Sequence, residues 1–334
     1  MRFIFKTLGL AFAVLALFAA SILAWGHIGI RRTRPPLPTL EEVLDVDPTA
    51  SLPVRLSYVN TASQRMPRSG VLDPALDSEP HLDYVMSHVS FLLEWQDGRI
   101  FSIDTGMDAE GAIRFGGPVE QMSGGDPIEP HKSTSEVLGQ ARSRLAGIGF
   151  SHLHADHTGG LRRLCRDLRS DAGRAASDRI PVYQTRYQLG GLNHTTRASK
   201  SQLREAECAE VEPLLTQPLI PVPGFPGLSV ITVGGHTPGS QFFVAHVRTM
   251  PGMSEGKYSD IETWIFTGDI VNHAAGIDKN LSKPPLYSWL VVPEDTGRLE
   301  VLRGYLKQLS EQKGVRLLVS HDQKQIEASG IPSF

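Results

Sequence analysis

Three histidines and one aspartate lie within six positions of the stretch Ser151-His152-Leu153-His154-Ala155-Asp156-His157-Thr158-Gly159-Gly160. The apolar segment 144–150 before it predicts a short buried strand, and the glycines after it predict a tight turn into a helix that starts near Leu161. The four side chains would then lie on a loop between two rigid elements. The chain has only 12 histidines in 334 residues, so chance clustering is improbable and the stretch indicates a metal site.

Three further donors each follow an apolar, strand-like segment. His236 stands in Gly-Gly-His-Thr-Pro-Gly-Ser after segment 228–233, Asp269 follows segment 264–268, and His321 follows segment 315–320. One zinc ion takes three or four protein ligands, so two clusters of donors on the first loop need partners from elsewhere in the chain. Four strand ends therefore carry candidate ligands for a two-metal site.

The motifs His-x-His-x-Asp-His-x-Gly-Gly, Gly-His-Thr-Pro-Gly-Ser, Gly-Asp and Ser-His, in this order, resemble those of the metallo-β-lactamase superfamily. The resemblance extends from about residue 85 to residue 325. It implies an α/β fold, a four-layer αβ/βα sandwich of two sheets covered by helices. It also implies two zinc ions or other divalent metals, with seven ligands: His152, His154 and His236 at the first metal, Asp156, His157 and His321 at the second, and Asp269 as a bridge.

The residue at the bridging position indicates which branch of the superfamily the chain resembles most. Hydrolases similar to acyl homoserine lactonases and glyoxalase II have an aspartate where Asp269 stands, whereas the true β-lactamases lack it. Diiron oxidoreductases of the superfamily usually carry Glu at the position of Ala155. Lactonases commonly have a tyrosine three positions after the bridge, where this chain has Asn272 followed by His273. These two residues are candidates for substrate binding, with an ordinary loop role as the alternative, and the loop 272–290 is expected to cover the site.

The expected chemistry is hydrolysis of an ester, lactone or related acyl bond in a small molecule. A metal-bound hydroxide would be the nucleophile, because a bound divalent metal lowers the pKa of water to about 7. Asp156 is a ligand first and a proton carrier second. No serine or cysteine nucleophile beside a credible base and no phosphate-binding glycine loop is found in the sequence.

Two other functions remain to be distinguished. One is a mononuclear iron oxidoreductase similar to the sulfur dioxygenases of the same fold, against which the retained Asp156, His157 and His321 argue. The other is a non-catalytic binding module, which would be expected to have lost ligands. Metal analysis separates the three: about two zinc ions per chain for the hydrolase, one iron for the oxidoreductase and none for the module.

Other segments fit an α/β protein. Segments 89–95 and 99–106 around Asp-Gly predict a β-hairpin. Asp104, in its Ile-Asp-Thr-Gly ending, either orients a ligand histidine from outside the metal site or caps the following turn. A strand is expected over 180–183 and helices over 133–146 and 295–309. Five histidines outside the motifs are expected to be structural or exposed: His81, His88, His131, His194 and His246.

The N-terminus carries an export signal or a membrane anchor. Residues 7–30 contain no Asp, Glu, Lys or Arg, and basic residues flank the segment on both sides. Its length favours a spanning helix over a cleaved signal. We expect an anchor over 1–30, a Pro-rich tether over 31–50 that spaces the enzyme from the bilayer, and a catalytic domain over 51–334. The domain is expected outside the cytoplasm, as a secreted protein if the segment is cleaved.

Charge and cysteine content limit the possible partners and the possible disulfide bonds. The net charge is −3, from 33 basic and 36 acidic residues, which offers no basic field for nucleic acid. Two cysteines, Cys165 and Cys208, are too few for a disulfide framework, and they either pair or remain free. The expected partners are a small acyl substrate and, through the N-terminal helix, a membrane, whereas the oligomeric state stays open.

Overall fold

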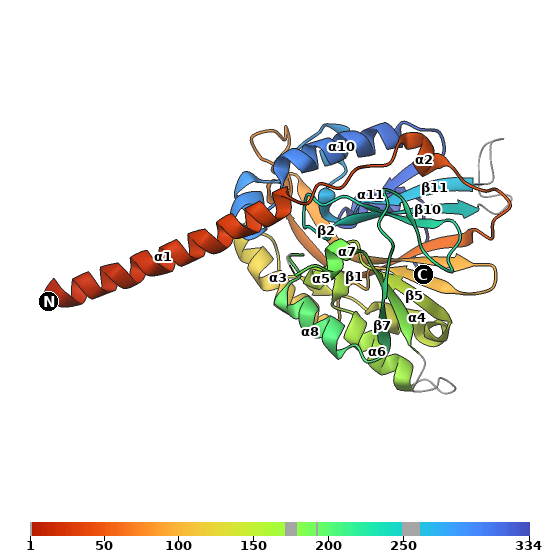
Figure 1. The fold of residues 1–334 in the computed structure, drawn as a ribbon, viewed down its shortest axis with the longest axis horizontal. Coiled ribbons are helices and arrows are strands. Elements are labelled where there is room, and N and C mark those ends of the chain that lie inside the picture. Colours follow the sequence, from red (N-terminus) through yellow and green to blue (C-terminus); the bar gives the residue numbers. More distant parts are fainter. Residues whose placement is uncertain (1, 171–178, 192, 249–260) are drawn as a thin grey trace.

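The computed structural model describes residues 2–170, 179–191, 193–248 and 261–334. Two β-sheets lie face to face within these ranges (Figure 1). The first sheet has the strand order β4-β1-β2-β3-β5-β6-β7, with the bounds Pro53–Pro67 for β1, Asp83–Trp95 for β2, Ile100–Ile103 for β3, Glu129–Pro130 for β4, Leu145–Gly149 for β5, Ile180–Gln184 for β6 and Ala209–Pro213 for β7. The second has the order β12-β11-β10-β9-β8, with Ile220–Pro221 for β8, Leu228–Thr232 for β9, Gln241–Arg248 for β10, Ile261–Phe266 for β11 and Val315–Leu318 for β12.

Apolar side chains fill the space between the two sheets. Phe91 and Phe101 from the first sheet meet Phe243 and Phe266 from the second, and all four are fully buried. Aromatic side chains of this size dominate the free energy gained on burial. This shared core holds the sheets, and therefore the loops at their edges, in a fixed relation.

Helices cover the outer face of each sheet. On the first sheet, α4 (Thr134–Leu138) and α6 (Leu161–Ser170) bury leucines against β5 and β6. On the second, α10 (Thr296–Ser310) buries four leucines and α2 (Leu40–Leu44) buries Val43. The remaining helical segments are α1 (Arg2–Arg31), η1 (Arg68–Gly70), α3 (Ala109–Ser123), η2 (Gly139–Arg144), α5 (Ala155–Thr158), α7 (Arg186–Leu189), α8 (Arg197–Glu205), η3 (Gly268–Ile270), α9 (Ala275–Asp278), η4 (Tyr287–Val291) and α11 (Gln323–Ala328). The layers run helix, sheet, sheet, helix, as expected of the αβ/βα sandwich.

Most local predictions agree with these elements. The hairpin is β2 and β3, paired antiparallel around Gly98 at φ 86°, and the strands predicted before His152 and over 180–183 are β5 and β6. The helix predicted over 295–309 is α10, which buries the four leucines of its inner face. The helix predicted over 133–146 is wrong in extent. It ends at Leu138, a 3₁₀ segment follows from Gly139, and the chain is already extended at Leu145.

The two cysteines form a disulfide. Cys165 on α6 bonds to Cys208, just before β7, at an S–S distance of 2.15 Å. Both residues are buried in the apolar cluster outside the first sheet. The sequence left open whether the two cysteines pair or remain free. The structure shows that they pair, and the disulfide links α6 to the edge of the first sheet.

The N-terminal helix α1 projects from the domain as a single rod (Figure 1). Residues 31–50, expected to form a spacer, are instead packed along the domain. Arg34 forms two hydrogen bonds with Asp295, at 2.6 and 2.8 Å, and Val43 is fully buried against the second sheet. The prolines keep residues 31–50 extended, as predicted. The apolar side chains of this segment pack on the domain, because that removes apolar surface from water.

Candidate metal centre

The seven predicted ligands meet where four strands end. His152 and His154 follow β5 on the loop that leads into α5, whereas Asp156 and His157, expected on the same loop, lie within α5 itself. His236 follows β9, Asp269 lies in η3 after β11, and His321 follows β12. Strands β11 and β12 are parallel, so their carboxyl ends lie at the same edge of the second sheet. The fold thus brings together residues that are up to 169 positions apart, from His152 to His321.

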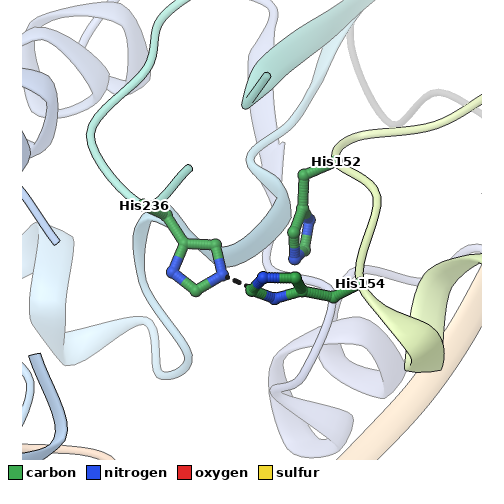
Figure 2. Close-up of side chains that lie close together, drawn as sticks. All are labelled: His152, His154 and His236. Carbon is green, nitrogen blue, oxygen red and sulfur yellow. Dashed lines mark hydrogen bonds between the residues drawn. The ribbon is translucent and has the colours of Figure 1, made fainter. Parts of the chain in front are cut away.

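The first group consists of His152, His154 and His236, whose ligand atoms all lie within 4.8 Å of one another. Figure 2 shows the three imidazoles converging from two loops. Nε2 of His236 lies 3.2 Å from Nδ1 of His154, and the ring of His152 stands edge-on to both neighbours. Three converging imidazoles form a set of nitrogen donors suited to zinc or a similar divalent ion.

The second group consists of Asp156, His157, Asp269 and His321. Oδ1 of Asp269 lies 3.1 Å from Nε2 of His157 and 3.0 Å from Nε2 of His321. Oδ2 of Asp156 lies 3.6 and 3.5 Å from the same two nitrogens. Two imidazoles and two carboxylates therefore face a common point.

Asp269 lies between the two groups. Its Oδ1 faces the second group, while its Oδ2 is 3.8 Å from Nε2 of His152 and 3.7 Å from Nε2 of His236 in the first. One carboxylate thus presents one oxygen to each group. This is the geometry that a bridging ligand requires.

Several of these polar atoms are buried without a hydrogen-bond partner. Nε2 of His152 is in this condition, and Nε2 of His157 and Oδ1 of Asp269 lie 3.1 Å apart without the geometry of a hydrogen bond. A buried polar atom without a partner costs about 1–3 kcal/mol, so a folded chain seldom keeps several together without a ligand. Metal ions coordinated by these atoms would remove the cost, and the donor set fits divalent cations.

The charge states also suit a cation. Burial, with the neighbouring His236, lowers the pKa of His154 to about 3, so its lone pair is free at neutral pH. Burial alone would lower the pKa of His157, but Asp104, Asp269 and Asp156 outweigh it and raise that pKa well above the usual value. Three carboxylates around one imidazole make the centre strongly attractive to positive charge.

Comparison with known proteins gives a match to structures and none to sequences. No family model matches the chain, and no curated protein matches it either. Among solved structures, an N-acyl homoserine lactone hydrolase with N-hexanoyl-L-homoserine at its catalytic metal centre is similar, with a TM-score of 0.56 and 16% identity over 83% of this chain and 96% of that one. A mutant of AiiA from Bacillus thuringiensis, with bound N-decanoyl-L-homoserine, gives 0.55 and 17% over 83% and 96%.

A probable metal-dependent hydrolase from Staphylococcus aureus gives a TM-score of 0.50 and 15% identity over 82% of this chain and 91% of that one. These solved chains are matched over 91–96% of their own length. This chain has the metallo-β-lactamase fold. The identity is low, so the likeness concerns the fold, and the side chains of this chain must carry any argument about its chemistry.

Within this metallo-β-lactamase fold, Asp104 holds the first ligand loop in place. Its Oδ2 lies 2.8 Å from Nδ1 of His157, and its Oδ1 accepts a hydrogen bond from the backbone N–H of Ser151 at 2.7 Å. Asp104 has φ 61°, a conformation that a non-glycine residue seldom adopts. The surrounding contacts hold the residue in this conformation, which favours the orienting role over that of a simple turn cap.

Two residues that the sequence did not single out act on the first group. Oε1 of Glu294 lies 2.5 Å from Nδ1 of His236, and Nζ of Lys283 donates to Glu294 at 2.8 Å and to the backbone oxygen of Asp269 at 2.5 Å. Lys283 belongs to the loop 272–290 that was expected to cover the site, and Glu294 follows that loop by four residues. No periodicity marks them, and a lysine and a glutamate eleven positions apart give no recognisable motif.

His88 also lies closer to the centre than the sequence indicated. It is fully buried in β2, with Nδ1 3.4 Å from Oδ2 of Asp156 and its ring packed edge-on against that of His321. Nδ1 of His321 itself lies 2.7 Å from the backbone oxygen of Ser87. Consecutive residues of β2 therefore contact two members of the second group.

Asn272 and His273 occupy different surroundings. Asn272 is buried, and its backbone oxygen accepts a hydrogen bond from the hydroxyl of Tyr84. His273 packs on the ring of Tyr84 at 5.5 Å, and its Nδ1 accepts a hydrogen bond from the backbone of Ala275. The contacts of His273 point to a structural role in the loop, whereas the Asn272 side-chain oxygen is buried without a partner.

Proposed function

We propose that this protein is a binuclear metal-dependent hydrolase that cleaves an ester, lactone or related acyl bond of a small molecule. The observation that carries the proposal is the position of Asp269, with one oxygen toward each of two groups of ligands. A single metal would use one of these groups and leave the other buried without a ligand. The arrangement therefore favours two metals over the mononuclear iron site of an oxidoreductase.

In this proposal the residues divide as the motif resemblance implies. His152, His154 and His236 would hold the first ion, Asp156, His157 and His321 the second, and Asp269 both. When bound, such a pair supplies a water with a pKa of about 7 and polarises the acyl oxygen of the substrate. Zinc suits this mixture of nitrogen and oxygen donors, and other divalent metals are alternatives.

Asp156 is proposed as the proton carrier. Burial alone would raise its pKa, but His157, His88 and His321 outweigh it and hold the pKa below its ordinary value. The ionised carboxylate can accept the proton released when the nucleophile attacks, and can return it to the oxygen of the departing alcohol. His88 would fix the carboxylate in place from the side of β2.

The substrate class is proposed from chemistry and fold together. N-acyl homoserine products are bound by similarly folded hydrolases, and a lactone is an acyl ester that the proposed centre could open. Asn272 stands where lactonases commonly have a tyrosine, so the same lactones need not be the preferred substrate. We therefore propose the class of acyl esters and lactones rather than one compound.

The apolar helix is proposed as a membrane anchor, with residues 51–334 as a catalytic domain outside the cytoplasm. The part of α1 from Phe12 to Arg31 is long and apolar enough to cross a bilayer, and almost none of it is buried in the protein. The bond between Cys165 and Cys208 supports the location, since disulfides persist in oxidising compartments. A cleaved signal, which would release a secreted enzyme, is the alternative.

Metal content and hydrolysis test the proposal together. The full chain, purified in detergent, should contain about two zinc ions and should hydrolyse members of a panel of esters and lactones. His152→Ala and Asp269→Ala should lose metal and activity, while Asp278→Ala, an exposed aspartate on α9, should keep both. One iron per chain without hydrolysis would support the oxidoreductase instead, and no metal would support a binding module.

A further inference from the structure

Two of the four tryptophans are exposed, and both belong to the region where α1 meets the domain. Trp25 on α1 is 60% exposed and Trp289 on η4 is 57% exposed, whereas Trp95 and Trp264 are 1% and 4% exposed. Nε2 of His27 lies 3.0 Å from the backbone oxygen of Trp289, so η4 contacts the helix two residues after Trp25. Trp prefers the boundary between hydrocarbon and water when one side is apolar and the other wet.

Trp289 belongs to a larger apolar surface on η4. Leu286, Trp289, Leu290 and Val291, here called the η4 patch, are 70%, 57%, 51% and 45% exposed. Isolated exposed leucines are ordinary, but four large exposed apolar side chains within six positions are a dense apolar cluster. Such a surface in water has an unfavourable free energy of hydration and indicates a partner.

The other side of the same loop contacts the metal centre. Lys283 donates to Glu294 and to the backbone of Asp269, and the hydroxyl of Ser288 donates to Glu294. Nζ of Lys283 also lies 5.4 Å from the ring centroid of Tyr287. Burial and the charges of Glu294 and Asp269 raise the pKa of Tyr287 well above its usual value. One short loop thus has an apolar outer side and an inner side bonded to candidate ligands.

We propose that the η4 patch enters the interface of the bilayer that holds α1, so that a membrane-resident acyl amphiphile reaches the metal centre past η4. This inference rests on the proposed function and on the proposed anchor. It adds a second contact with the lipid and a substrate class. The substrate would be an ester or lactone with a long acyl chain, which partitions into the membrane.

The depth of the patch agrees with this placement. A helix rises about 1.5 Å per residue, so the 20 residues from Phe12 to Arg31 span about 30 Å, the thickness of a hydrocarbon core. His27 is four residues before Arg31 and therefore lies about 6 Å inside the charged end of the helix. Trp289, bonded to His27, would lie at the same depth, in the layer where aromatic side chains concentrate.

The junction between α1 and the domain is rigid enough to fix this depth. A Cβ atom at Gly26 would lie 3.2 Å from the ring of Pro293, so the absence of a side chain allows the close contact. Ile30 is fully buried, and Arg34 is bonded to Asp295 immediately before α10. An inserted α1 would therefore hold the η4 patch against the lipid.

Quenching of tryptophan fluorescence tests the contact without reference to activity. Full-length Trp25→Phe is reconstituted into phosphatidylcholine vesicles containing some phosphatidylglycerol, with or without brominated acyl chains. Trp95 and Trp264 are buried, so Trp289 is the reporter. Brominated lipid should quench its emission, and the quenchable component should be absent in Trp25→Phe/Trp289→Phe. Vesicle-bound protein without quenching at Trp289 overturns the inference.

A second test compares substrates of different chain length. The patch variant Leu286→Ser/Leu290→Ser/Val291→Ser should hydrolyse long-chain esters in vesicles about tenfold more slowly, with hydrolysis of water-soluble short-chain esters unchanged. The control Val211→Ser/Leu215→Ser/Val301→Ser removes three exposed apolar side chains from β7, the following loop and α10 and should behave as the wild type. Equal ratios of long-chain to short-chain rates in both variants overturn the inference.

The outcomes distinguish failure of this inference from failure of the proposed anchor or of the proposed function. If alkaline carbonate extracts the full chain from vesicles, the anchor is absent, and if no ester or lactone is hydrolysed, the proposed function fails. If the patch joined two copies of the chain instead, Trp289 would not be quenched, and the patch variant would convert a dimer to a monomer in detergent. That result also overturns the inference while leaving hydrolysis intact.

Discussion

Glu294 lies 2.5 Å from His236, 58 positions away in the sequence, and fixes the ring nitrogen that does not face the other imidazoles. Glu294 is itself held by Lys283 and Ser288. Burial would raise the pKa of Glu294, but Lys283 and His236 lower it to about 2. The carboxylate is therefore ionised and keeps His236 in the tautomer that presents Nε2 to the centre.

Replacing Glu294 should weaken the first metal site. Glu294→Gln keeps the shape but loses the charge, so we expect zinc affinity to fall about 10- to 100-fold. Competition with a zinc chelator measures the change. Glu300→Gln, an exposed glutamate on α10, is the matched control. Equal affinities in the two variants would show that Glu294 does not act on the metal through His236.

Loss of the charge on Asp269 should affect both sites at once. Asp269→Asn retains one oxygen but can no longer offer a carboxylate oxygen to each group. We expect the zinc content to fall from about two to one or fewer per chain, with at least a 100-fold loss of hydrolysis. Elemental analysis and ester assays measure the two effects. Two tightly bound ions in this variant would rule out a bridge through Asp269.

The disulfide should contribute measurably to stability. It closes a loop with a sequence separation of 43, and a closure of this length stabilises a fold by about 2–4 kcal/mol, chiefly by restricting the unfolded chain. Cys165→Ala/Cys208→Ala should lower the urea midpoint by a corresponding amount. Adding reductant should do the same to the wild type and nothing further to the variant. A midpoint that is insensitive to reductant would contradict the bridge.

His246 should make the domain sensitive to acid. Burial lowers its pKa to about 4, and its Nδ1 lies 3.0 Å from the hydroxyl of Thr263. The folded pKa is below the unfolded value near 6.5, so this contribution is complete above pH 6.5 and is lost as the pH falls toward 4. Between pH 7 and pH 5 the loss should be about 2 kcal/mol.

The comparison variant is His246→Asn, which keeps a polar side chain but does not titrate in this range. Urea unfolding of both proteins at pH 7 and pH 5 gives the difference in acid sensitivity, and this difference cancels the contributions of the other histidines. We expect the variant to lose about 2 kcal/mol less than the wild type on acidification. An identical loss in both proteins would place the acid-sensitive group elsewhere.

The candidate ligands were predictable because the donors at the strand ends occur in dense motifs, and parallel packing of strands brings such ends to one edge. His152, His236 and His321 each follow an apolar segment whose length and composition identify a strand. Lys283 and Glu294 were not predictable, since they lie in an irregular loop. Their importance arises from tertiary contacts, and nothing local distinguishes them from solvated charges.

Boundaries were less predictable than elements. The helix expected to reach Ala146 ends before Gly139, which adopts φ 52°, and no propensity in the following segment restores it. The spacer expected over 31–50 is extended by its prolines, as predicted. Whether Leu37 and Val43 are exposed or buried depends on the surface of α10 and the second sheet, and composition alone does not describe that surface.

The packing of residues 31–50 along the domain also limits how far the domain can move from α1. A flexible linker of this length would let the domain reach many positions and orientations above the membrane. Here residues 31–50 are bound to the domain by contacts such as those of Arg34 and Val43, so no flexible linker separates α1 from the domain. An anchored molecule would encounter substrates by lateral diffusion, and its rate would depend on molecules per unit area rather than per unit volume.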